Sequence, residues 1–88
     1  NRYEQGEDYY KRMIATDIDS LGPHHPSVAN DLNGLAQFYI RRGNYSEAEP
    51  LITRAFSIYQ KTYGMNNVLT ISTCAAYALV EFHLGKID

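Results

Sequence analysis

The 88-residue sequence contains a single cysteine, Cys74, so an internal disulfide is excluded and a reducing compartment is favoured. No apolar run is long enough to span a bilayer, and no signal-peptide pattern opens the chain. Eight lysines and arginines stand scattered against ten aspartates and glutamates, which argues against a nucleic-acid backbone or a membrane surface as the main partner. These absences lead us to expect a cytoplasmic location.

What is present is the composition of a small folded domain. Hydrophobic residues make up 44% of the chain, and eight tyrosines and three phenylalanines supply apolar surface, so the chain is not of the disordered class. A chain of this length holds at most one domain with a modest core. It begins with Asn1 rather than methionine and ends just after a glycine, so we expect a piece of a longer protein.

Glycines divide the chain at a constant spacing of 21 residues, at Gly22, Gly43, Gly64 and Gly85. Because glycine is favoured just past a helix end, this spacing predicts four helices, at residues 4–21, 26–42, 46–63 and 67–84. No segment shows the sustained alternation of a strand, so the predicted fold class is all-α.

Each interval also carries apolar residues at the three- and four-residue spacing of a helix face. The first three stripes are Tyr10, Met13, Ile14, Ile18 and Leu21; Val28, Leu32, Leu35, Ala36 and Tyr39; and Leu51, Ile52, Ala55, Phe56, Ile58, Tyr59 and Tyr63. Pro26 suits a first helical turn, and Asn67 suits a helix cap. Ser46, with Glu49 three residues later, predicts a capping box for the third helix.

The chain resembles itself at an offset of 42 residues. Six aligned pairs are identical: Tyr3/Tyr45, Glu7/Glu49, Arg12/Arg54, Gly22/Gly64, Ala36/Ala78 and Gly43/Gly85. Apolar positions also coincide: Tyr10/Ile52, Ile14/Phe56, Leu21/Tyr63, Leu32/Cys74, Leu35/Tyr77 and Phe38/Val80. A fixed period of this size is typical of a helical solenoid.

The middle of the chain resembles the tetratricopeptide (TPR) signature. The matching residues are Leu32-x-x-Leu35-Ala36-x-x-Tyr39, followed in register by Gly43, Tyr45, Ala48 and Ala55. The period of 42 and the preceding segment Gly22-Pro23-His24-His25-Pro26-Ser27-Val28-Ala29 resemble the longer repeat variant of kinesin light chains and related bacterial proteins. The resemblance weakens after Gly64, where Met65-Asn66-Asn67-Val68 replaces the Pro-x-His-Pro unit and Glu81 replaces a tyrosine.

The resemblance implies a right-handed superhelix of antiparallel helix-turn-helix repeats. Residues 1–22 are then the second helix of one repeat, residues 23–64 a complete repeat, and residues 65–88 the first helix of a further repeat. The first helix of each such hairpin lines a concave groove in this family. The positions that match the groove are Asn30, Asn33, Gln37, Ile40 and Arg41, and then Ser72, Ala75, Leu79, Phe82 and His83.

By this resemblance, Asn33 is expected to bond a peptide backbone, because an amide both donates and accepts hydrogen bonds. Arg41 is expected to meet an acidic group. The alternative is that these side chains are solvated helix surface. The last helix is apolar on nearly all sides, which favours self-association through residues 68–84.

Other chemistry-bearing residues favour structural use. His24 and His25 are adjacent in a turn, where they cannot easily converge on one metal ion, and we expect a capping role. Cys74 takes the place of a core leucine, which predicts a buried, inert thiol. Asp17 and Asp19 lie on different faces of their helix and do not form a carboxylate pair with each other. We therefore expect no catalytic site, no metal and no cofactor.

The sequence thus predicts a non-catalytic protein-interaction module that binds a peptide segment or partner domain through the concave groove. Two alternatives stay open. One is a structural spacer or self-association segment. The other is a sensor array that regulates an enzymatic domain elsewhere in the parent chain.

Overall fold

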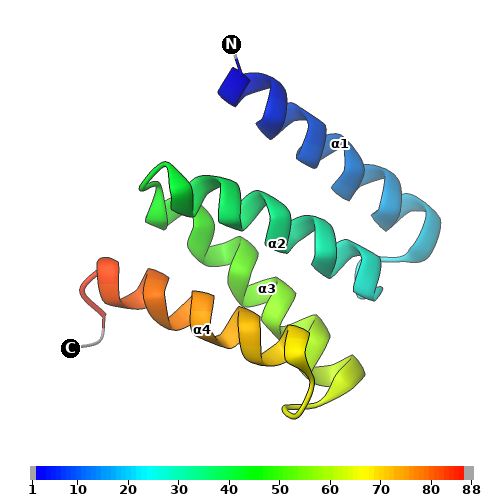
Figure 1. Cartoon of the computed structure of the whole chain (residues 1–88). Helices are drawn as coiled ribbons and strands as arrows, with labels where there is room; N and C mark the ends of the chain where they lie inside the picture. Colours follow the sequence, from blue (N-terminus) through cyan, green and yellow to red (C-terminus); the bar gives the residue numbers. More distant parts are fainter. Residues whose placement is uncertain (1, 87–88) are drawn as a thin grey trace.

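Four helices form the whole of the regular structure in the computed structural model, which describes residues 2–86. They are α1 (Arg2–Leu21), α2 (Pro26–Arg41), α3 (Tyr45–Tyr63) and α4 (Val68–His83), and each runs antiparallel to the next (Figure 1). The described residues include no strand, which confirms the all-α helical-repeat fold. Of the segments 1–22 and 65–88, the positions Asn1, Ile87 and Asp88 lie outside the described residues.

The turns follow the glycine spacing. Gly43 has a φ of 78°, a left-handed conformation that glycine adopts without a steric penalty. The chain then reverses within two residues, because the N–H of Asn44 donates back to the carbonyl of Tyr39 over 2.8 Å. The other three equally spaced glycines also have positive φ, which confirms the predicted helix ends.

Two of the three predicted helix starts are confirmed. His25 caps α2, with its Nδ1 accepting from the N–H of Ser27 over 3.0 Å, and Pro26 occupies the first turn. Asn67 caps α4 by accepting from the N–H of Leu69 over 2.8 Å.

The capping box predicted at Ser46 is wrong, because α3 begins one residue earlier, at Tyr45. Asn44 takes the N-cap position without a side-chain cap bond, and its carbonyl accepts from the N–H of Ala48. The tight turn at Gly43 and the stacking of Tyr45 on His83, with ring centroids 4.2 Å apart, account for the earlier start.

The core lies between α2 and α3. The buried apolar residues form two clusters, which are Val28, Ala29, Leu32, Ala55, Ile58 and Tyr59, and then Leu35, Ala36, Tyr39, Ala48, Ile52 and Val80. All but Val80 come from these two helices. Alanines 29, 36, 48 and 55 are fully enclosed, so the two helix backbones approach closely, and a larger side chain at any of them would force the helices apart.

The outer helices are less enclosed. α1 has no fully buried residue, and its stripe residues Ile14 and Ile18 rest on the core from one side. Leu21 and Tyr63, predicted for the core stripes, are 47% and 44% exposed, because each is the last residue of its helix.

Cys74 is exposed, so the prediction of a buried thiol is wrong. Its repeat-equivalent residue on α2, Leu32, is covered by α3, whereas no described helix covers this face of α4. The same face leaves Val68, Ile71, Leu79 and Phe82 exposed. The whole body is only 17 Å thick across its Cα atoms, so it presents two broad faces.

This packing predicts that Ile52→Ala, at a fully buried position of α3, lowers the free energy of unfolding by about 3 kcal/mol. The matched change Ile71→Ala, at a side chain that is 53% exposed, costs well under half as much. Urea denaturation followed by circular dichroism measures both. Equal losses would show that the core does not lie between α2 and α3.

Candidate peptide-binding surface

The predicted groove residues of α2 lie on one side of that helix, turned away from its buried stripe. Arg41 is exposed, while Gln37 and Ile40 are half-buried, with Ile40 also packed against the second core cluster. Asn30 is already engaged, because its Oδ1 accepts a hydrogen bond from the hydroxyl of Tyr59 on α3. Asn30 therefore also supports the packing of α2 on α3.

Asn33 differs from its neighbours on α2. Its side chain is half-buried, and its Oδ1 is enclosed with no hydrogen-bond donor among the described residues. A buried carbonyl oxygen without a donor is costly, and a ligand N–H placed beside it would remove that cost.

The α4 part of the predicted groove is mostly apolar. Leu79 is 44% exposed and Phe82 is 57% exposed, and Ser72 is exposed beside them. His83 has partners within the chain, since it stacks on Tyr45 and its Nδ1 lies 2.9 Å from the carbonyl oxygen of Leu79.

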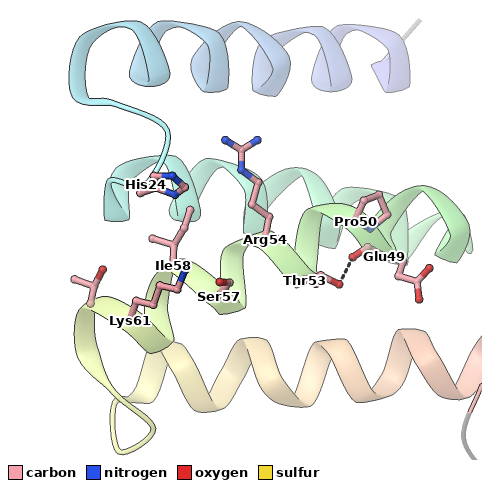
Figure 2. Close-up of a pocket in the computed structure, with 9 residues that line it drawn as sticks. His24, Glu49, Pro50, Thr53, Arg54, Ser57, Ile58 and Lys61 are labelled. Atoms are coloured by element: carbon pink, nitrogen blue, oxygen red, sulfur yellow. Dashed lines mark hydrogen bonds between the residues drawn. The ribbon is translucent and has the colours of Figure 1, made fainter.

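A hollow of about 570 Å³ lies on α3, and it includes none of the predicted groove residues (Figure 2). Its lining consists of His24, Glu49, Pro50, Thr53, Arg54, Ser57, Ile58, Lys61 and Thr62. Sequence reasoning missed this surface. The available signal was the recurrence of polar and basic residues at 54, 57 and 61, which a helical spacing places on one face.

Two carboxyl pairs lie at the contacts between successive hairpins. Asp31 on α2 is 6% exposed and faces Asp17 on α1. Burial, followed by the hydrogen bond and charge of Asp17, raises the pKa of Asp31 from 3.8 to about 7. The sequence comparison of Asp17 with Asp19 was correct, but it missed this partner on the next helix.

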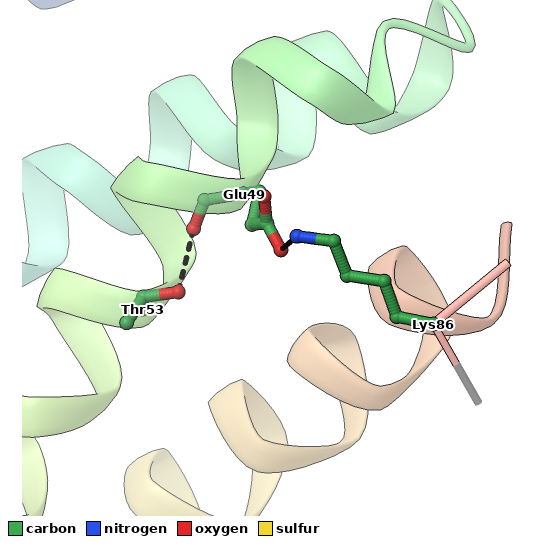
Figure 3. Close-up of polar contacts among 3 residues, drawn as sticks. All are labelled: Glu49, Thr53 and Lys86. Atoms are coloured by element: carbon green, nitrogen blue, oxygen red, sulfur yellow. Dashed lines mark hydrogen bonds and ion pairs between the residues drawn. The ribbon is translucent and has the colours of Figure 1, made fainter. Parts of the chain in front are cut away.

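The second pair joins α3 to α4. The hydrogen bond between Glu81 and Glu49 raises the pKa of Glu81 and lowers that of Glu49. Lys86 completes the cluster through an ion pair with Glu49 at 2.6 Å, and Thr53 donates to the Glu49 backbone carbonyl over 2.7 Å (Figure 3).

An equivalent cluster lies 42 residues earlier. There Glu7 has Tyr39 as its hydrogen-bonding partner and Lys11 as its ion-pair partner, at 2.8 Å. Glu81 stands where Tyr39 does, so a carboxyl group that keeps its proton replaces a phenol as the group facing the glutamate. The departure from the family pattern at Glu81 therefore preserves the contact while changing its chemistry.

Within residues 2–86, no three histidine, cysteine, aspartate or glutamate side chains gather closely enough to hold a metal ion. In the same part of the chain, no helix has the length and the apolar character that crossing a bilayer requires.

The Asp17–Asp31 contact predicts a pH dependence of stability. Because folded Asp31 keeps its proton until about pH 7 while an unfolded aspartate loses it near pH 4, folding takes up a proton between these values. The free energy of unfolding should therefore fall as pH rises from about 4 to 7, by as much as about 4 kcal/mol for this group.

Asp31→Asn should remove that part of the pH dependence, whereas the matched change Asp19→Asn, at an exposed position of α1, should leave it unchanged. Urea denaturation at a series of pH values measures the slopes. An unchanged slope in Asp31→Asn would contradict the assignment.

Comparison with known proteins agrees with this geometry. The tetratricopeptide repeat family matches residues 1–61 and again residues 32–88, so the two matches together span the chain. The Clustered mitochondria protein homolog of Kluyveromyces lactis is 29% identical over 76 residues, which is 86% of this chain. The chain spans 6% of the length of that relative.

Tetratricopeptide repeats in general mediate protein–protein interactions and are non-catalytic modules. The repeated hairpins, the small residues at their contacts and the double family match all agree. The chain belongs to the tetratricopeptide repeat family.

Proposed function

We propose that the chain is a non-catalytic module that binds an extended peptide segment or a partner domain through the outward surface of α2 and α4. The binding residues are Asn30, Asn33, Gln37, Ile40 and Arg41 with Ser72, Leu79, Phe82 and His83. Asn33 carries this proposal, because its enclosed Oδ1 has no donor within the described chain. A peptide N–H along α2 supplies that donor.

The two ends of this surface suit different parts of a ligand. Arg41 is exposed near the end of α2 and offers a planar cation to a carboxylate. Leu79 and Phe82 on α4 offer apolar area to a hydrophobic side chain. A ligand with an acidic group and an apolar anchor therefore fits the surface. A cytoplasmic location is part of the proposal and rests on the unpaired thiol of Cys74.

The exposed face of α4 supports a second candidate, which is self-association. Val68, Ile71, Leu79 and Phe82 are each at least 44% exposed on one short helix. Apolar area of this kind is removed from water when a second copy packs against it. A spacer segment, or an array that regulates an enzymatic domain of a longer chain, uses the same scaffold without a dedicated ligand groove.

Asn33→Ala and Arg41→Ala test the peptide-binding proposal. Peptides selected from a random display library on the immobilised chain should bind each variant at least tenfold more weakly, because each loses a hydrogen-bonded or charged contact. Arg12→Ala and Asn66→Ala remove the same side-chain types from other exposed positions and should retain affinity. Peptides that bind all four variants equally well would contradict the proposal.

Self-association is tested by light scattering over a range of concentrations. The mass should rise above the 10.0 kDa of one chain, and Ile71→Glu should restore the monomer by placing a charge on the α4 face. Tyr9→Glu makes the matched change at a side chain of α1 that is 61% exposed and should leave association intact. A monomer at all concentrations would exclude this candidate.

A further inference from the structure

The hollow on α3 has a basic character that the rest of the chain lacks. Arg54 and Lys61 are exposed in its lining, and neither forms an ion pair with another described residue. The Arg54 guanidinium donates only a long hydrogen bond, 3.4 Å, to the carbonyl of Pro23. Both cations therefore keep most of their capacity to bind an anion.

The acidic residue of the hollow is held at one end. Glu49 is paired with Lys86 at 2.6 Å, so its charge is offset from outside the hollow. In Figure 2, Arg54 extends from α3 toward α1, while His24 lies near Ile58 at the opposite end from Glu49. Since the chain as a whole carries a net charge of −2, only such a local group of cations favours an anionic ligand.

The floor of the hollow is apolar. Ile58 is 4% exposed and Pro50 lies further along the same face, and both contribute to the lining. A free phosphate ion would leave this floor uncovered, whereas a peptide side chain can cover it. Ser57 and Thr62 add hydroxyl groups that can donate to a ligand backbone carbonyl.

The dimensions suit an extended peptide. Residues 50 to 61 span about 16 Å along a helix, which is the length of about five residues of extended chain. Residues 54 and 61 are about 10 Å apart along the axis, or three residues of extended chain. Two acidic side chains on either side of an apolar one thus match two cations on either side of an apolar floor.

We propose that the outward face of α3 binds an extended acidic peptide segment, in which Arg54 and Lys61 hold two carboxylates and an apolar side chain between them rests on Ile58. This surface shares no residue with the proposed groove of α2 and α4. Its occupation therefore does not depend on that groove.

The test is a nuclear magnetic resonance titration of the ¹⁵N-labelled chain with the blocked peptide Glu-Glu-Leu-Glu-Glu. The amide signals of Arg54, Ser57, Ile58 and Lys61 should shift, and the neutral peptide Gln-Gln-Leu-Gln-Gln should leave them unchanged. Arg54→Gln and Lys61→Gln should each weaken binding several-fold, because each removes one charged contact at an exposed site.

Arg41→Gln is the matched control, because it removes the same charge from an exposed position of α2, outside the hollow. It should retain the affinity for the acidic peptide, and equal weakening would overturn the proposal in favour of general charge attraction. An absence of shifts would also overturn it. Inorganic phosphate that reproduces the shifts would replace the acidic peptide by a small-anion site. Circular dichroism confirms that each variant keeps its helix content, and Lys61, in the last turn of α3, provides a variant remote from the Pro23 contact.

Discussion

The close approach of α2 and α3 is the contact on which the rest of the molecule depends. Four fully enclosed alanines line it, and Leu32 and Ile52 fill the space between the two backbones. Burial of such side chains contributes roughly 1.5 to 3 kcal/mol each, relative to exposure. The outer helices have much less buried surface, so α1 and α4 are positioned mainly by packing against this central hairpin.

The central hairpin also determines where the candidate surfaces lie. Because each helix uses one face for the core, its opposite face is turned outward. On α2 that face carries Asn33 and Arg41, and on α3 it carries Arg54 and Lys61. The two proposed surfaces therefore belong to different helices of one rigid unit, and a ligand on one leaves the other accessible.

The contacts between successive hairpins have a different character. The α1–α2 contact includes the facing carboxyl groups of Asp17 and Asp31, and the α3–α4 contact includes those of Glu49 and Glu81. In each pair one carboxyl group has a raised pKa, so each contact is stabilised by a retained proton. Proton loss therefore weakens the contacts between hairpins, while the apolar α2–α3 contact does not titrate in this way.

Local sequence signals predicted most of the fold. The glycine spacing and the apolar stripes located all four helices, because both effects act within a few residues. The α3 start was misplaced because the turn at Gly43 and the ring of His83, which is distant in sequence, decide it. The exposure of Cys74 was missed because the repeat pattern describes a covered helix, whereas no described helix covers that face of α4.

The candidate surfaces were predicted less completely. The outward position of Arg41 follows from helical periodicity, but the bond between Asn30 and Tyr59 joins residues 29 positions apart and has no local signal. The hollow on α3 and the Asp17–Asp31 contact likewise depend on how separate helices pack. The tetratricopeptide repeat was recognised from its residues, while the similarity to the kinesin light-chain variant stays a prediction.

Hydrogen exchange of individual backbone amides tests the central role of the α2–α3 hairpin most directly. If that hairpin is the stable unit, amides in the middle of α2 and α3, such as those of Leu35 and Ile52, should exchange only through global unfolding. Amides in α1 and α4 should exchange faster, through partial opening. Protection of α1 or α4 equal to that of α2 and α3 would contradict the account.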